Sequence, residues 1–376
     1  MDLLLTIILF LIAAKIGEEI AERIKMPPVM GELLFGIVIG PSILGIVAPS
    51  EFTDMLGSIG IIVLLFLAGM DTDISDLKKS GKPSFLSAIG GVFIPMIFGF
   101  AVAYFLGFSK TESIFIGAIL TATSVGITVR TLVDMKKLDT SVGMTILGAA
   151  VIDDIIGIMI LTVLGSLASF SIFGFFGVIG KILLFFALAL YLGFKFMPLI
   201  MRKVQRFRAP EALLSFSLIF MLGISLLAES IGLAAIIGAF FGGIILHRVS
   251  QKEIISEKVY SLGYSLFIPI FFVNIGVETD IEAIPEVGLL ALAIILVAVI
   301  GKIFGSGIGA KLGGFKYKDS LKIGIGMIPR MEVALIIART GMKLGIIGES
   351  VFSITIVLVM VTTLITPLLL KLAFRE

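Results

Sequence analysis

The sequence contains no cysteine and only one histidine, His247. The missing cysteines exclude disulfides, cysteine-bound iron–sulfur clusters and thiol catalysis, and they leave the redox compartment open. A single histidine argues against a metal site built from histidines. Charged residues make up only 15% of the chain, whereas a soluble domain has about 25%. The net charge is +2, so the charge balance gives no sign of a nucleic-acid partner.

What the chain has in abundance is apolar surface. Hydrophobic residues make up 58% of it and the mean hydropathy is +1.18, which predicts an all-α polytopic membrane protein with the lipid bilayer as its surroundings. The N-terminus begins Met1-Asp2 and lacks the basic region of a signal peptide. The first apolar run is therefore expected to be a retained helix.

Runs of about 20 mainly apolar residues, the length that crosses a bilayer as a helix, predict thirteen membrane spans. They cover about 3–22, 29–47, 57–72, 84–107, 111–133, 141–166, 174–201, 211–228, 231–247, 259–277, 286–311, 320–343 and 350–372. The loops on one side carry 22 of the 29 Lys and Arg residues, and those on the other side carry three. Because positive charge is retained in the cytoplasm, we expect the N-terminus outside the cell membrane and the C-terminus in the cytoplasm.

An internal repeat divides the chain. Residues 69–74 (GMDTDI) end the third span, and residues 276–281 (GVETDI) end the tenth, at an offset of 207. The same offset places Gly36 on Gly243. It covers seven spans, an odd number, so the second copy enters the membrane from the opposite face. The sequence thus predicts two inverted six-helix repeats joined by span seven, the architecture of secondary transporters.

The fifth and twelfth spans both contain residues that interrupt helices. Thr121, Thr123 and Ser124 lie in the middle of the fifth, and the same offset places this patch on the region of Pro329 and Arg330 in the twelfth. Proline cannot donate a backbone hydrogen bond and crowds the preceding turn. The alternative is that the hydroxyls bond to carbonyls of an intact helix. Because the repeat counterpart is also interrupted, we expect two discontinuous helices that cross near the bilayer midplane.

Two adjacent carboxylates, Asp153 and Asp154, lie near the middle of the sixth span. A charge at that depth costs at least about 2.5–3.5 kcal/mol, so it indicates a functional site; the alternative is a polar loop that divides the span. Asp153 lies about 18 Å from the cytoplasmic end of its helix, and Lys302 of the eleventh span lies about 13–14 Å from its own. These matched depths predict an Asp153–Lys302 ion pair, rather than a lysine that extends to the membrane surface.

The second carboxylate, Asp154, is expected to face the cavity between the broken helices. A carboxylate among hydroxyls and carbonyls suits Na⁺, and burial can also make it a proton site. A group that takes either ion, but never both, gives obligatory exchange. Arg330 is expected to pair with a carboxylate, either Glu332 or Glu32, and the sequence leaves this choice open. We interpret these three residues as structural, or as lining the cytoplasmic funnel.

Five motifs occur in order across nearly the whole chain: residues 28–42 (PVMGELLFGIVIGPS), 65–71 (LFLAGMD), 122–127 (ATSVGI), 153–154 (DD) and 329–332 (PRME). With them the chain resembles the cation–proton antiporters, specifically the electrogenic sodium/proton type. Potassium systems of the Kef type belong to the same branch.

The resemblance implies a homodimer whose protomers each form a single membrane transporter unit over residues 1–376. Helices at about 3–72 and 211–277 would form a dimerisation domain. Helices at about 84–166 and 286–372 would form a core that moves against it, with 174–201 as linker.

The same resemblance assigns ion binding to Asp154, which would hold the Na⁺, with Asp153, Thr123 and Ser124 as further ion-binding residues and Lys302 pairing with Asp153. The implied activity is exchange of Na⁺ or Li⁺ for H⁺, electrogenic, without a cofactor and without enzymatic chemistry. K⁺/H⁺ exchange on the same fold remains an alternative. Remote alternatives are a cation channel and an intramembrane aspartyl protease, although the latter needs two acids on facing helices.

Overall fold

The computed structural model describes residues 3–165, 172–279 and 283–375, and the regular elements in these ranges are all helical. The first half contains α1 (Leu3–Arg23), α2 (Pro28–Ile39), α3 (Glu51–Asp71), α4 (Ile74–Lys79), α5 (Gly81–Phe105), α6 (Lys110–Ile119), α7 (Val125–Asp134) and α8 (Ser141–Gly165). After α9 (Ile172–Val204) come α10 (Ala212–Ser230), α11 (Ala235–His247), α12 (Lys252–Leu262), the π-helical turn η1 (Gly263–Phe267), α13 (Ile268–Glu278), α14 (Ala283–Leu312), α15 (Tyr317–Gly326), α16 (Glu332–Lys343) and α17 (Glu349–Phe374).

Each of the thirteen predicted spans contains helix in the structure, although α2 ends at Ile39 and residues 40–47 of the second span are not helical. The fifth consists of α6 and α7, and the twelfth of α15 and α16, each with a break in the middle. The tenth consists of α12, η1 and α13 in direct succession, and α4 is a short additional helix. Eight of the described helices are long and apolar enough to cross a membrane, and α2 and α11 are shorter apolar helices. The chain is an integral membrane protein, as its composition predicts.

The local sequence explains where several helices begin. The Ser50 hydroxyl accepts a hydrogen bond from the backbone N–H of Thr53 at the start of α3, and the Thr53 side chain bonds back to Ser50. Ser109 and Glu112 form the same reciprocal pair at the start of α6. These capping boxes satisfy backbone donors that have no partner within the helix, and so they fix the ends of helices that enter the membrane.

The inverted repeat is visible in the helix boundaries and in the packing. α6 and α15 begin and end 207 residues apart, and α7 and α16 also begin 207 apart. A Cβ added to Gly69 would lie 2.0 Å from the Phe240 carbonyl oxygen, and one added to Gly276 would lie 2.3 Å from that of Leu33. The offset of 207 takes Gly69 to Gly276 and Leu33 to Phe240, so the two contacts are equivalent in the two repeats. Only glycine permits these two helix crossings, since any side chain would overlap with backbone.

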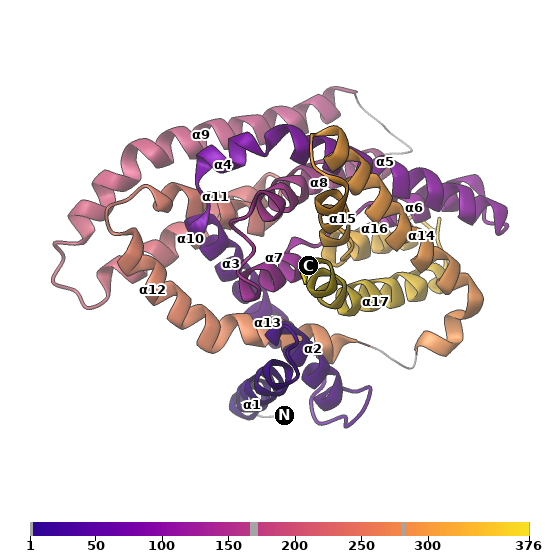
Figure 1. Cartoon of the computed structure of the whole chain (residues 1–376), viewed down its shortest axis with the longest axis horizontal. Coiled ribbons are helices and arrows are strands. Elements are labelled where there is room, and N and C mark those ends of the chain that lie inside the picture. The colour runs from indigo at the N-terminus through magenta and orange to yellow at the C-terminus, as the bar shows by residue number, and fades with distance from the viewer. Residues whose placement is uncertain (1–2, 166–171, 280–282, 376) are drawn as a thin grey trace.

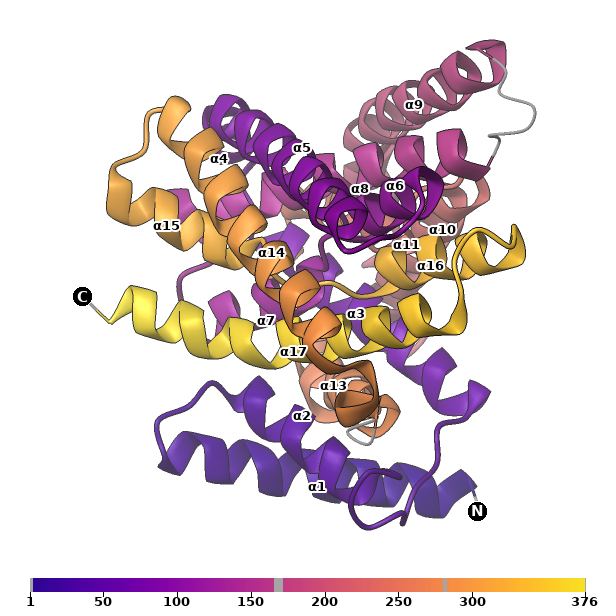
Figure 2. The same cartoon turned by 90° about the vertical axis from the view of Figure 1, so that its right-hand side faces the viewer.

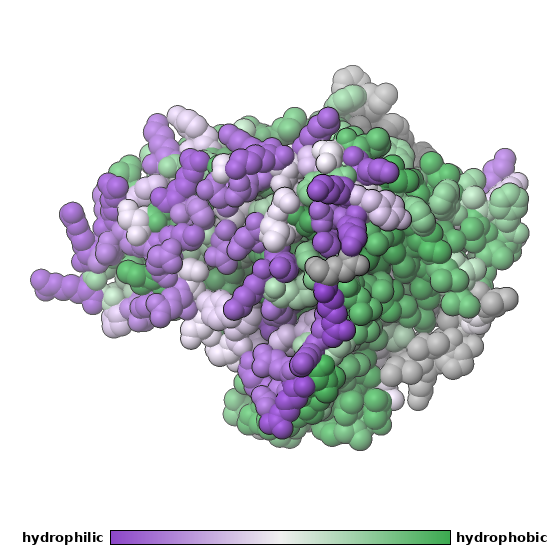
Figure 3. All heavy atoms as spheres, in the orientation of Figure 1, coloured by the Kyte–Doolittle hydropathy of each residue, from purple (hydrophilic) through white to green (hydrophobic). Residues whose placement is uncertain are grey.

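The helices divide into regions that are easily seen in the cartoons. In Figure 1, α9 runs along one outer edge, α1 and α2 lie at the bottom, and α5, α14 and α17 lie to the right. In Figure 2, the chain ends lie on opposite sides, as an odd number of membrane crossings requires. Hydrophilic residues gather over the left and centre of the face in Figure 3, and hydrophobic residues cover its right-hand side. One polar end and an apolar flank are what a bilayer imposes.

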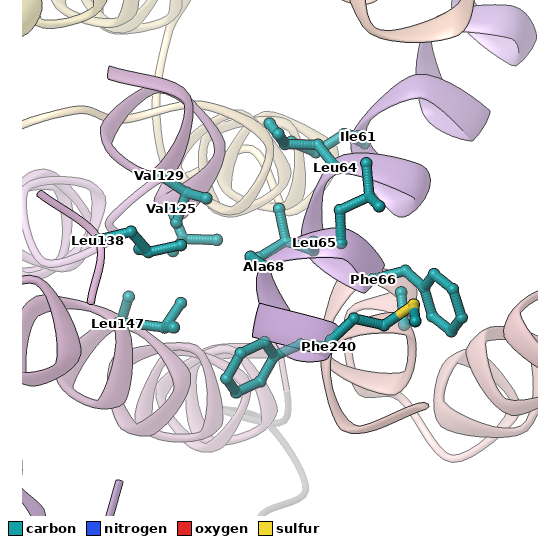
Figure 4. Packing of buried hydrophobic residues seen from close by; sticks show 14 of the residues in the cluster. Ile61, Leu64, Leu65, Phe66, Ala68, Val125, Val129, Leu138, Leu147 and Phe240 are labelled. Atoms are coloured by element: carbon teal, nitrogen blue, oxygen red, sulfur yellow. The ribbon is translucent and has the colours of Figure 1, made fainter. Parts of the chain in front are cut away.

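Apolar side chains of α3 pack against those of α7 and α8 and form an apolar surface between these helices. Figure 4 shows side chains of α3 on one side of this surface and those of α7, α8 and the loop between them on the other. The residues concerned are Ile61, Leu64, Leu65 and Ala68, opposite Val125, Val129, Leu138 and Leu147. Contacts of this kind are non-directional, so they can persist while one helix slides along another.

Candidate ion-binding site

The two helix breaks cross each other, and hydrogen bonds join them. The backbone N–H of Ser124 donates to the Pro329 carbonyl at 2.7 Å. The Thr128 hydroxyl donates to the Gly326 carbonyl at 2.7 Å, and that of Thr123 to the Met327 carbonyl at 3.5 Å. The hydroxyls of the fifth span thus bond to carbonyls that the break in the twelfth leaves without helical partners. Non-helical backbone is tolerated at membrane depth only where its polar groups find partners, and these hydrogen bonds provide such partners.

The Asp153–Asp154 pair of α8 lies at the level of this crossing. On one side of the pair, Ile146 of α8 lies against Gly326, where α15 ends; a Cβ on Gly326 would lie 2.5 Å from its side chain. On the other side, a Cβ on Gly157 would lie 3.4 Å from Val333, where α16 begins. Both carboxylates therefore lie between the points at which the twelfth span stops and resumes.

Lys302 of α14 forms the ion pair that the matched depths predicted. Its Nζ lies 3.0 Å from Asp153 Oδ1, and both side chains are buried. Gly91 of α5 provides the room: a Cβ there would lie 3.4 Å from Lys302 Nζ and 2.3 Å from the Ser306 hydroxyl. A buried charge is tolerated when it is paired and costly when it is not, so Asp153 and Lys302 depend on each other.

Residual exposure distinguishes the two carboxylates. Asp154 keeps 7% of its surface accessible, and Thr123 and Ser124 keep 6% each, whereas Asp153 keeps 1% and Lys302 none. Among the described polar side chains at the crossing, the accessible ones are therefore one carboxylate and two hydroxyls. Hard oxygen ligands of this type suit a small cation. Within the described ranges, no three histidine or acidic side chains are grouped to hold a metal ion.

Arg330 lies in the break of the twelfth span, and of the two carboxylates left open as its partner, Glu32 is wrong, since Glu32 pairs with Arg130. The Arg330 guanidinium donates hydrogen bonds at 2.9 Å to the carbonyls of Leu120 and Ala298, and a third to the carbonyl of Ile328. Leu120 caps the C-terminus of α6, where unpaired carbonyls create a partial negative charge. Backbone carbonyls therefore satisfy the cation: those of Leu120 and Ile328 lie where helices are interrupted, and that of Ala298 lies inside α14.

The other two supporting residues have separate outcomes. The side chain of Glu332, which begins α16, lies outside the described part of the structure. Glu32 is fully buried in α2, and its carboxylate lies 3.5 Å from Arg130 of α7. Arg130 is one of the 22 Lys and Arg residues that the sequence assigns to loops on one side, and in the structure it is buried inside α7. Its spacing of four from Asp134, which puts both on one helix face, was the available sequence signal.

Comparison with known proteins decides the family. The family model described as "Sodium/hydrogen exchanger, transmembrane" matches residues 5–375. The chain belongs to the sodium/hydrogen exchanger family. This is a family of transporters, which favours transport over the protease alternative.

Relatives of the exchanger cover almost its whole length. The Na⁺/H⁺-K⁺ antiporter GerN of Bacillus cereus is 38% identical over 98% of this chain and 95% of its own. A Na⁺/H⁺ antiporter of Enterococcus hirae is 38% identical over 96% of both chains. The solved sodium proton antiporter MjNhaP1 of Methanocaldococcus jannaschii superposes with a TM-score of 0.73 at 20% identity, over 98% of this chain and 96% of that one. The likeness to MjNhaP1 confirms the antiporter fold.

Proposed function

We propose that the exchanger is a secondary active antiporter that moves Na⁺ out of the cytoplasm in exchange for external H⁺, with Asp154 as the carboxylate that takes either ion. The observation that carries the proposal is the position of Asp154 at the crossing of two broken helices, with accessible surface, beside an Asp153 already paired with Lys302. Family membership and the names of the relatives agree with this activity.

In this proposal the neighbouring groups have distinct tasks. Thr123 and Ser124 supply oxygen ligands beside Asp154, and the N-terminal ends of α7 and α16 contribute partial positive charge that limits how many cations enter. The Asp153–Lys302 pair holds a further proton when Asp154 carries a proton, and releases it when Na⁺ occupies Asp154. More than one proton then moves for each Na⁺, so a net charge crosses the membrane in each cycle and exchange is electrogenic.

The helices would act as two bodies. α5 to α8 and α14 to α17 form the moving core, α1 to α3 and α10 to α13 form the dimerisation domain of a homodimer, and α9 links them. The apolar surface between α3 and α7 (Figure 4) is suited to such sliding. The distribution of Lys and Arg favours an N-terminus outside the cell membrane and a C-terminus in the cytoplasm. No cofactor is required, since the ion gradients supply the driving force.

K⁺/H⁺ exchange is the second candidate, because GerN carries K⁺ as well as Na⁺ and H⁺ in its name. The test uses proteoliposomes with a pH-sensitive dye inside and Na⁺, Li⁺ or K⁺ added outside, with and without a clamped membrane potential. We expect Na⁺ and Li⁺ to move protons, and K⁺ to move few. Proton movement with K⁺ alone would favour the second candidate. Cation current without proton movement would indicate a channel and refute the proposal.

Replacing Lys302 by glutamine tests the role of the ion pair. Removing one partner of a buried pair leaves the other uncompensated, at a cost of about 3–5 kcal/mol, so Lys302→Gln should lower the thermal unfolding temperature. It should also make exchange insensitive to the clamped potential. The control is Lys79→Gln, which removes an exposed lysine paired with Asp76 in α4 and should change neither. If Lys302→Gln behaves like this control, the pair has no part in charge movement.

A further inference from the structure

A second buried cluster of charges lies away from the candidate ion-binding site. At its centre is Arg130 of α7, which is 2% exposed. Its guanidinium lies 3.2 Å from Asp134, 3.5 Å from Glu32 and 3.7 Å from Glu18, and it stacks 4.4 Å from the ring centre of Tyr264. One guanidinium thus holds three carboxylates and an aromatic ring.

The partners of Arg130 come from elements that are distant in sequence. Glu18 belongs to α1, Glu32 to α2 and Tyr264 to η1, and only Asp134 shares α7 with it. Lys15 of α1 extends the cluster, with its Nζ 2.8 Å from Glu18 and 3.1 Å from the Tyr264 carbonyl. In the proposed division, α7 belongs to the core and α1, α2 and η1 to the dimerisation domain. The ion pairs therefore join the two bodies.

The position of the cluster along the membrane normal is also informative. It lies within two turns of the end of α1 and of the start of α2. The loop between these two helices contacts the end of α17, where Lys371 Nζ lies 3.4 Å from the Met26 sulfur. The cluster is therefore on the C-terminal side of the protein. Arg130 lies two turns along α7 from Ser124, so the helix that carries the candidate ion ligands also carries this contact.

We propose that Arg130 is the centre of an ionic latch, formed with Glu18, Glu32 and Asp134, that holds α7 against α1, α2 and η1 and keeps the ion site closed on the C-terminal side. The apolar surface between α3 and α7 permits sliding, whereas charge pairs that are buried and oriented do not slide without breaking. The latch has two arrangements, closed and open, and transport requires it to open in each cycle. This inference rests on the proposed alternating access.

The test measures access to the interface and not transport. Ala68 of α3 is 2% exposed and lies at the surface between α3 and α7 (Figure 4). In a chain without cysteine, Ala68→Cys creates a single reactive thiol, which is labelled with a membrane-impermeant maleimide from the C-terminal side of sealed vesicles. We expect slow labelling in the otherwise native protein. Arg130→Met keeps the length of the side chain without its charge and should raise the labelling rate at least about tenfold.

Arg23→Met is the matched control, because Arg23 pairs with Glu19 within α1 and is exposed; its labelling rate should stay that of the parent. Asp134→Asn provides a second variant, with a smaller increase expected. Unchanged labelling in folded Arg130→Met or Asp134→Asn would overturn the latch. Loss of folded protein in both would mean that the cluster only maintains the fold, and would overturn it equally. Labelling that rises in a protein without Na⁺-dependent proton flux would support the latch and refute the proposed function.

Discussion

Replacing Asp154 by asparagine is expected to reduce Na⁺-dependent proton movement to the level of vesicles without protein. Asparagine has the size of aspartate but neither its charge nor its proton, so the site loses both of its proposed occupants in one substitution. The measurement is dye-reported proton flux in proteoliposomes on addition of Na⁺ or Li⁺. The ion pair with Lys302 is made by Asp153, so replacing Asp154 should leave that pair in place.

Two controls separate a lost site from a lost fold. Asp76→Asn makes the same chemical change in α4, where Asp76 forms an exposed pair with Lys79, and it should leave exchange intact. The thermal unfolding of Asp154→Asn should stay close to that of the parent protein. Transport that continues in this variant would show that another group carries the ions, and the assignment of the site would be withdrawn.

Much of the fold was predictable because the bilayer restricts what the chain can do. Helix length is set by membrane thickness, and the break in the twelfth span falls at Pro329, which has no backbone N–H to donate to a continuing helix. The offset between residues 69–74 and 276–281 was sufficient to predict the repeat, and the crossings at Gly69 and Gly276 show its physical basis. Residues 280–281 of the second motif lie outside the described structure.

The Asp153–Lys302 pair was predictable for a similar reason. The rise per residue of a helix is fixed, so the depth of a buried charge follows from its distance to the end of its span. When two opposite charges lie at the same depth in a bilayer, each has few possible partners besides the other. The structure contains this pair at 3.0 Å.

The partners of the two buried arginines were not predictable. Depth gives the position of a residue along the helix axis, but not which neighbouring helix it faces. Arg330 bonds to the carbonyl of Leu120, where α6 ends, and to that of Ala298 inside α14. Arg130 forms ion pairs with carboxylates of α1 and α2, about 100 residues earlier in the chain. Both arrangements depend on tertiary packing that hydropathy and spacing do not contain.

A disulfide between α3 and α7 is expected to stop transport completely and reversibly. A Cβ added to Gly126 of α7 would lie 3.4 Å from Cγ1 of Ile61 in α3, close to where the sulfur of a cysteine replacing Ile61 would lie. Disulfides need β-carbons about 3.5–4.5 Å apart, so Gly126→Cys with Ile61→Cys should cross-link on oxidation. The bond would tie the proposed core to the dimerisation domain, so Na⁺-dependent proton flux should fall to background and return on reduction.

The matched control cross-links two helices of the same proposed body. A Cβ on Gly57 of α3 would lie 4.0 Å from Cβ of Asn274 in α13, so Gly57→Cys with Asn274→Cys should form a disulfide equally well. Transport should persist in this pair after oxidation, because α3 and α13 are proposed to move together. The native chain has no cysteine, so each effect is due to the introduced bond. If oxidised Gly126→Cys/Ile61→Cys still exchanges ions, α7 does not move against α3, and the two-body division is wrong.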